Sequence, residues 1–202
     1  MLTIIDYGLG NLYSLSHSLS FIGVENRVSG DPGEIARAQK LILPGVGAFE
    51  DAANRLRRTG LDALIRARAA EGTPLLGICL GMQLLFEESF EYGRHAGLGL
   101  IEGQVCPIAR DLDRPLKVPH IGWNSLKFHR AGRLTSHIQP GDFVYFVHSY
   151  YVKGCGRALV ASAEYGVEVP AIVEADNVMG TQFHPEKSGG VGLSILRAFA
   201  EM

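Results

Sequence analysis

The segment Pro74–Gln83 constrains the fold more than any other part of the chain. It reads PLLGICLGMQ, an apolar run in which Gly77 and Gly81 flank Cys79 and a helix-like sequence follows. An apolar strand that enters a helix through Gly-x-Cys-x-Gly is the nucleophile-elbow pattern with cysteine in place of serine. The elbow residue adopts a strained turn, and only small residues fit two positions to either side of it. The segment therefore predicts an α/β fold with Cys79 raised at the start of a helix.

Cys79 has two interpretations on this pattern alone. It is either a buried core cysteine beside two turn glycines, a common situation for free cysteine, or a nucleophile. Backbone N–H groups and the helix dipole at such a turn favour a thiolate and can hold an oxyanion. A partner base is needed to separate the two interpretations.

His184 is the candidate base, in the sequence TQFHPEK of residues 181–187. Proline at 185 keeps the preceding residue out of the helical region, so His184 is expected to be extended. Alternation in an extended segment sends the side chains of 184 and 186 to the same side. We therefore predict a triad in which Cys79 attacks, His184 moves the proton and Glu186 orients the imidazole.

The first half of the chain alternates strand-like and helix-like segments. Expected strands cover residues 2–5, 24–28, 41–43 and 75–78. Helical spacing covers residues 12–22, 50–70 with a break near Gly60, and 80–88. This order predicts a mostly parallel, flavodoxin-like open sheet with helices on both faces.

The second half changes character, because its strand-like segments are closely spaced and predict an added antiparallel region. These segments are 98–105, 125–128, 143–147, 158–163, 171–174 and 178–183. A hairpin turn is expected at residues 175–177, and a closing amphipathic helix at 191–199. No linker or repeat interrupts the pattern, so one domain over residues 1–202 is expected.

Two glycine loops follow strands at the predicted ligand-binding edge of the sheet. In open α/β sheets ligands bind beyond the carboxyl ends of the strands. Gly45 and Gly47, which follow the expected strand at 41–43, can turn backbone N–H groups towards an oxyanion, although an ordinary glycine turn is the competing interpretation. Gly8 and Gly10 follow the first strand, but a dinucleotide fingerprint needs a third glycine where this chain has Tyr13.

Composition excludes several classes of function. The 19 basic and 21 acidic side chains give a net charge of −2, without the basic excess of a general nucleic-acid binder. The hydrophobic share of 47% is that of a globular chain. No apolar run reaches the ~20 residues of a membrane span, and no signal peptide is apparent. Three widely separated cysteines favour a reducing cytoplasm, and no metal-ligand spacing is present. We expect no metal and no cofactor.

These motifs together resemble the class I (triad) glutamine amidotransferases. The resemblance narrows to the glutaminase subunits of imidazole glycerol phosphate synthase through three further segments: PGVGAF at 44–49, PHIGWN at 119–124 and YFVHSY at 145–150. It extends over nearly the whole chain.

The resemblance implies a function in histidine biosynthesis. Glutamine would be hydrolysed through a thioester on Cys79 to glutamate and ammonia. The ammonia would pass through a tunnel to a separate (β/α)8-barrel cyclase subunit in a heterodimer, which makes imidazole glycerol phosphate and AICAR. In this family, turning of the oxyanion loop towards the site is thought to depend on the partner and its ligand.

The resemblance also implies roles for individual residues. Bound L-glutamine would be contacted by Gln83, Glu91, His148, Ser149 and Tyr150. Backbone N–H groups of Leu80 and of the loop Gly45, Val46 and Gly47 would form the oxyanion hole. The docking face and tunnel mouth would include Asn11, Trp123, Tyr145 and Lys187. Each has a structural alternative, as a core aromatic, a central strand or a solvated charge.

Three other functions remain open on the sequence. One is the glutaminase subunit of pyridoxal phosphate synthase, which also docks on a barrel. Another is a non-catalytic binding module of the same fold, although Cys79, His184 and Glu186 are all retained. An esterase is disfavoured, because the acidic triad member of that fold precedes the histidine in the chain.

Overall fold

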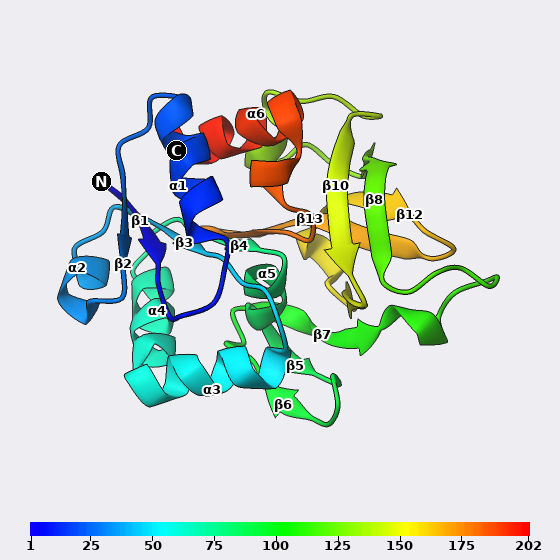
Figure 1. Ribbon diagram of the computed structural model, residues 1–202, viewed down its shortest axis with the longest axis horizontal. Coiled ribbons are helices and arrows are strands. Elements are labelled where there is room, and N and C mark those ends of the chain that lie inside the picture. The colour runs from blue at the N-terminus through cyan, green and yellow to red at the C-terminus, as the bar shows by residue number, and fades with distance from the viewer.

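An eight-stranded sheet forms the centre of the structure, a computed structural model that describes residues 1–202 (Figure 1). In spatial order its strands are β2 (Asn26–Ser29), β1 (Leu2–Ile5), β3 (Lys40–Leu43), β4 (Leu75–Ile78), β14 (Val178–Thr181), β13 (Glu168–Ala175), β12 (Leu159–Glu164) and β9 (Lys127–Phe128). The strands from β2 to β14 are parallel, and the remaining pairs are antiparallel. The prediction of a mostly parallel open sheet is confirmed.

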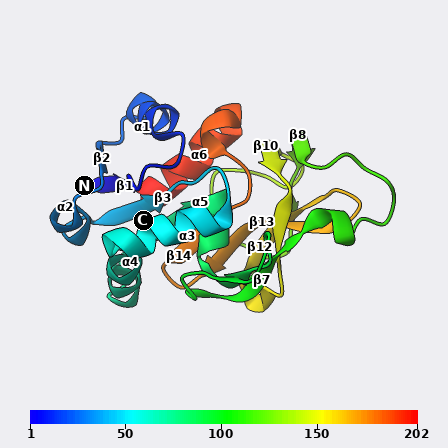
Figure 2. The ribbon, with the colours of Figure 1, turned by 60° about the horizontal axis from the view of Figure 1, so that its bottom comes forward.

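Helices cover both faces of this sheet, as predicted. Figure 2 shows α1 (Leu12–Phe21) and α6 (Gly189–Ala200) on one side, and α3 (Phe49–Thr59) and α4 (Leu61–Ala70) on the other. The short helices α2 (Pro32–Ala36) and α5 (Leu80–Leu84) complete the set. Alternation along β3 divides the core: Leu41 and Leu43 pack with α3 and α4, whereas Ile42 packs with α1 and α6.

Two smaller sheets flank the carboxyl ends of the parallel strands. One contains β11 (Tyr150–Lys153), β7 (Ile101–Pro107), β5 (Phe86–Ser89) and β6 (His95–Ala96); the other is a ribbon of β10 (Phe143–His148) and β8 (His120–Ser125). Short 3-10 turns are η1 (Ile108–Arg110), η2 (Arg133–Thr135), η3 (Gly156–Ala158) and η4 (Pro185–Lys187). None of the helices combines the length and apolar character that crossing a membrane requires.

Local signals placed most elements well. The strand at 75–78 is found unchanged, the helical region breaks at Gly60 with φ of 72°, and Asp176 turns the predicted hairpin with φ of 49°. Each expected strand of the second half overlaps an observed strand. The second strand was expected at 24–28 and lies at 26–29.

The helix predicted over 80–88 is wrong beyond its first turns. It ends at Leu84, and β5 begins at Phe86, which pairs with Ile101 of β7. A short apolar run fits either structure, and pairing with a strand distant in sequence decides for β5. The strands β6, β8 over residues 120–124 and β11, and the helix α2, were also not predicted.

The close packing of α6 against η4 at Gly192 leads to a prediction about the stability of the fold. A Cβ on Gly192 would lie 1.9 Å from the carbonyl oxygen of Pro185, whereas a Cβ on Gly190 in the same helix meets nothing. Gly192→Ala should lower the free energy of unfolding by roughly 1–3 kcal/mol through overpacking. Gly190→Ala should raise it by up to ~1 kcal/mol, because alanine favours the helix. Urea unfolding followed by circular dichroism measures both, and equal effects would contradict this packing.

Candidate active site

Cys79 occupies a strained turn between β4 and α5, as the elbow pattern predicts. Its φ of 54° and ψ of −110° are rare for a residue with a side chain. Two backbone hydrogen bonds hold the turn. The Cys79 N–H donates to the Thr181 carbonyl at 2.7 Å, and the Cys79 carbonyl accepts from the Gln83 N–H at 3.1 Å. Cys79 is therefore fixed by the sheet on one side and by the helix on the other.

The flanking glycines are required by close backbone approaches. A Cβ on Gly77 would lie 2.6 Å from the Gly81 carbonyl oxygen, and one on Gly81 would lie 1.8 Å from the Leu43 carbonyl oxygen. No side chain fits at either position. This contact also brings the end of β3, and the glycine loop after it, against the start of α5.

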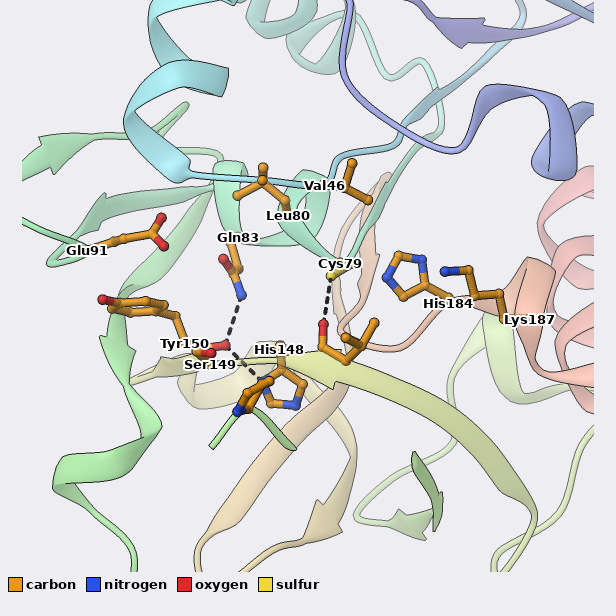
Figure 3. Close-up of a pocket in the computed structure, with 13 residues that line it drawn as sticks. Val46, Cys79, Leu80, Gln83, Glu91, His148, Ser149, Tyr150, His184 and Lys187 are labelled. Carbon is orange, nitrogen blue, oxygen red and sulfur yellow. Dashed lines mark hydrogen bonds between the residues drawn. The ribbon is translucent and has the colours of Figure 1, made fainter. Parts of the chain in front are cut away.

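His184 and Glu186 form the predicted pair. His184 is extended, with φ of −99° and ψ of 100°, and its Nδ1 lies 2.9 Å from Glu186 Oε1. Both side chains are only 3% exposed. The imidazole faces the Cys79 sulfur across the pocket (Figure 3). The histidine backbone is also fixed, because its N–H donates to the Tyr145 carbonyl and its carbonyl accepts from Ser188 Oγ.

The electrostatics of His184 suit a cysteine nucleophile. Burial lowers the pKa of the imidazole, but hydrogen bonds to the Cys79 and Glu186 side chains outweigh burial and raise the pKa to about 9. The raised pKa favours the protonated ring, and a positive charge beside a cysteine is typical of reactive cysteines.

A pocket of about 320 Å³ opens over this pair, within the size range of small-molecule sites. Cys79 and His184 line one end of it, and Glu91 and Tyr150 lie towards the other (Figure 3). The remaining predicted glutamine-binding residues line it as well: Gln83, His148 and Ser149. The pocket thus combines a cysteine and an imidazole at one end with a carboxylate at the far end.

Gln182 is a site residue that sequence reasoning missed. It is fully buried, and its Nε2 lies 3.8 Å from Cys79 Sγ. The Oε1 of Gln182 accepts a hydrogen bond from Gln83 Nε2 at 3.1 Å. The Nε2 of Gln83 also donates to the Tyr150 carbonyl at 2.9 Å. Alternation in the extended stretch before His184 would have put residue 182 on the same side as His184, so a signal for Gln182 was present. Glu186 reaches His184 through the 3-10 turn η4 instead.

His148 and His120 form a buried pair behind the pocket. Burial lowers the pKa of His148 to about 3 and that of His120 to about 4, so both rings are neutral. The Tyr150 carbonyl can only accept, so His148 Nδ1 donates to it at 2.9 Å, and His148 Nε2 accepts from His120 Nδ1 at 3.0 Å. Both nitrogens of His148 are therefore engaged within the protein, and its ring forms part of the pocket wall.

The predicted oxyanion-hole residues lie at two depths. Val46, Gly47 and Leu80 line the pocket, and Leu80 begins α5, where N–H groups lack acceptors within the helix. Gly45 lies behind them, against the start of α5, beside a small separate cavity that Glu186 and Asn11 also line. Gly47 has φ of 100°, a conformation that favours glycine.

The remaining predicted docking residues gather beside His184. Trp123 and Tyr145 are cross-strand partners in the β8–β10 ribbon, with ring centroids 6.0 Å apart. Trp123 is 55% exposed. Lys187 is exposed and lines the pocket next to the imidazole (Figure 3). Large exposed apolar side chains occur on the same ribbon: Ile121, at 57%, and Phe143, at 57%.

No group of three or more His, Cys, Asp and Glu side chains is arranged to hold a metal ion. Cys106 and Cys155 lie outside the pocket as free thiols. The polar groups at the site are those of an acyl-transfer centre: a cysteine, an imidazole with its carboxylate, and backbone N–H groups at a helix start.

The fold and a family match together define the class of this protein, the glutamine amidotransferases. The sequence model of the family "Glutamine amidotransferase class-I" matches residues 3–201. A solved glutamine amidotransferase superposes with a TM-score of 0.77 at 20% identity, covering 100% of this chain and 99% of that one. PurLQS from Thermotoga maritima superposes with the same score and identity, covering 99% of this chain and 97% of that one.

Sequence relatives narrow the class. The imidazole glycerol phosphate synthase subunit HisH of Geobacillus thermodenitrificans is 56% identical over 98% of this chain and 94% of its own. HisH of Bacillus subtilis is 53% identical over 100% of this chain and 96% of its own. The chain therefore belongs to the class I glutamine amidotransferase family of enzymes, among relatives that are HisH subunits.

The raised pKa of His184 predicts how stability depends on pH. Between pH ~6.5, the ordinary value, and about 9, the folded chain holds a proton that the unfolded chain has released. This contribution is fully present below pH ~6.5 and is lost as pH rises through 9. The difference in unfolding free energy between the wild type and His184→Asn should therefore shrink over this range. Urea unfolding at several pH values measures it.

Glu186→Gln is the matched control for this pH dependence. It keeps the imidazole but removes one partner that stabilises its charge, so the pH dependence should weaken without vanishing. If the difference in unfolding free energy between the wild type and His184→Asn stays constant from pH 6.5 to 9, the folded chain takes up no net proton at Cys79 and His184 together, and the prediction is wrong.

Proposed function

We propose that the chain is the glutaminase subunit of imidazole glycerol phosphate synthase, acting as one domain over residues 1–202 in the cytoplasm. The observation that carries the proposal is the elbow cysteine facing a buried His184–Glu186 pair in a pocket with Glu91 at its far end. The HisH relatives, which match over nearly the whole chain, support the choice of synthase.

The first half of the reaction forms a thioester. The Cys79 thiolate attacks the amide carbon of glutamine, and the carbonyl oxygen becomes an oxyanion. This oxyanion accepts hydrogen bonds from the backbone N–H groups of Leu80 and of the Gly45–Gly47 loop. The His184 imidazolium then gives its proton to the amide nitrogen. The C–N bond breaks, ammonia leaves, and the glutamyl group remains on sulfur.

The second half releases glutamate. The imidazole, now neutral, takes a proton from water as the water attacks the thioester carbon. The C–S bond breaks, glutamate departs, and the proton on His184 again stabilises the Cys79 thiolate. Glu186 accepts from Nδ1 throughout, and this hydrogen bond keeps Nε2 directed at the sulfur.

The far end of the pocket suits the backbone of an amino acid. Glu91 offers a carboxylate to the α-ammonium of glutamine, and Tyr150 and Ser149 line the wall beside it. Gln83 and His148 hold the Tyr150 carbonyl from two sides. The near-neutral charge of the chain fits a small zwitterion as substrate.

The partner in this proposal is the (β/α)8-barrel cyclase subunit HisF, which receives the ammonia and joins it to its own substrate in a heterodimer. The exposed apolar side chains of the β8–β10 ribbon, next to His184 and Lys187, suit a protein partner. Asn11, Trp123, Tyr145 and Lys187 would border the docking face and the exit for ammonia. Pyridoxal phosphate synthase remains the competing assignment of the partner.

Nucleophilic catalysis by Cys79 is tested in the assembled complex. Cys79→Ala should lower the rate of glutamine hydrolysis by roughly 10³-fold or more, because no thioester can form. Cys155→Ala is the matched control, because Cys155 is a buried cysteine in another part of the core. This variant should retain the activity. Added ammonium salt should restore product formation by the Cys79→Ala complex. Retained hydrolysis in Cys79→Ala would overturn the mechanism.

Partner choice is tested through Trp123. Trp123→Ala should weaken binding of the barrel cyclase by about 10-fold or more, as expected for a central aromatic of an interface. Val28→Ala removes an apolar side chain that is 38% exposed on β2, at the opposite edge of the central sheet, and should leave the affinity unchanged. Calorimetric titration measures both. Binding of a pyridoxal phosphate synthase barrel in place of the cyclase would favour the competing assignment.

A further inference from the structure

Tyr7 is a buried tyrosine whose hydroxyl reaches the loop that carries the proposed oxyanion hole. It follows β1 and is 6% exposed. Its Oη donates to the Pro44 carbonyl at 2.8 Å. A Cβ on Gly45 would lie 2.7 Å from the same Oη, so the phenol also packs against the next residue of the loop. Tyr7 does not line the pocket.

The backbone around Tyr7 is fixed independently of the loop. Asp6 Oδ1 accepts from the Gly8 N–H at 2.9 Å, which closes a tight turn around Tyr7. Gly8 has φ of 84°, and a Cβ there would lie 2.7 Å from Nη1 of Arg55. The turn therefore fixes the direction in which the Tyr7 side chain points, which is towards the Pro44 carbonyl. Burial raises the pKa of the Tyr7 hydroxyl far above its ordinary value, so it remains a donor at physiological pH.

The loop from Pro44 to Phe49 is held at both ends and free in the middle. Tyr7 holds its start through the Pro44 carbonyl, and Glu91 Oε2 holds its end by accepting from the Phe49 N–H at 2.5 Å. Between them Val46 is 40% exposed, and a Cβ on Gly47 would meet nothing. Rotation of the backbone is thus confined to the middle of the loop.

We propose that Tyr7 is a positioning residue for the oxyanion loop, a role that rests on the proposed glutaminase function. A carbonyl fixed at Pro44 also fixes the plane of the Pro44–Gly45 peptide, since the peptide unit is planar. The Gly45 backbone is then held against the start of α5, next to the Leu80 side chain and the Gly81 N–H. Without the hydroxyl this peptide rotates, and the loop spends less time with its N–H groups directed at the oxyanion.

A loosened oxyanion loop affects the transition state and leaves the bound substrate almost unchanged. The oxyanion exists only after the sulfur attacks, whereas glutamine is held at the far end of the pocket by other groups. Loss of the Tyr7 hydroxyl should therefore lower kcat and leave KM unchanged. A purely structural role would alter stability without this division between the two constants.

The test is Tyr7→Phe, which removes one oxygen and keeps the buried ring, assayed for glutamine hydrolysis in the complex with the barrel cyclase. The expected result is a fall in kcat of roughly ten-fold, less than the 10²–10³ of a lost oxyanion donor, with KM within two-fold of wild type. The rate of Cys79 alkylation by iodoacetamide should not change, because alkylation forms no oxyanion.

Tyr151→Phe is the matched control. Tyr151 is 2% exposed, and its hydroxyl donates to Asp111 at 2.9 Å, away from the pocket. This variant should show wild-type kcat. An unchanged kcat in Tyr7→Phe, a rise in activity, or an equal loss in Tyr151→Phe would overturn the role of Tyr7. An inactive wild-type complex would instead overturn the proposed function, so the two failures are distinguishable.

Discussion

Everything at this site depends on how closely three backbone segments approach one another at the carboxyl ends of β3 and β4. The end of β3, the elbow and the start of α5 are in contact where Gly77 and Gly81 have no side chains. A single methyl group at Gly81 would overlap the Leu43 carbonyl. That approach sets the strained conformation of Cys79 and places the glycine loop within reach of the helix N–H groups. The nucleophile and its proposed oxyanion donors are therefore one packing arrangement.

The polar groups around the elbow divide into a charged set and a neutral set. Hydrogen bonds to Cys79 and Glu186 keep His184 protonated despite its burial. Burial keeps His120 neutral, and burial together with the neighbouring His120 and His184 rings keeps His148 neutral. The same residue type is thus protonated in one place and a fixed donor and acceptor in the other. Contact with Cys79 and Glu186 makes the difference.

The sequence predicted what local rules determine. Proline at 185 correctly predicted an extended His184, and two glycines around Cys79 were enough to place the elbow. Glu186 does lie beside His184, but through the 3-10 turn η4 and not through the alternation of an extended segment. The predicted helix over 80–88 missed the boundary between α5 and β5, because Phe86 pairs with Ile101, a residue distant in sequence, and this pairing determines its structure. Contacts such as Tyr7 to Pro44 join residues 37 positions apart. No local pattern encodes such a contact, so only the fold reveals it. Gln182 was within reach of the alternation already used and was overlooked.

Hydrogen bonds fix the backbone more extensively on one side of the site than on the other. Cys79 is tied to the sheet and to α5, and His184 is tied to β10 through Tyr145 and Ser188. Facing them, Val46 and Gly47 form the unrestrained middle of a loop whose ends are fixed. Because the base and nucleophile already face each other (Figure 3), adjustment of the proposed oxyanion hole falls to these two residues. They are exposed, as are the apolar side chains of the β8–β10 ribbon. A partner that covers this side would contact the loop, whereas the Cys79, His184 and Glu186 side chains lie buried.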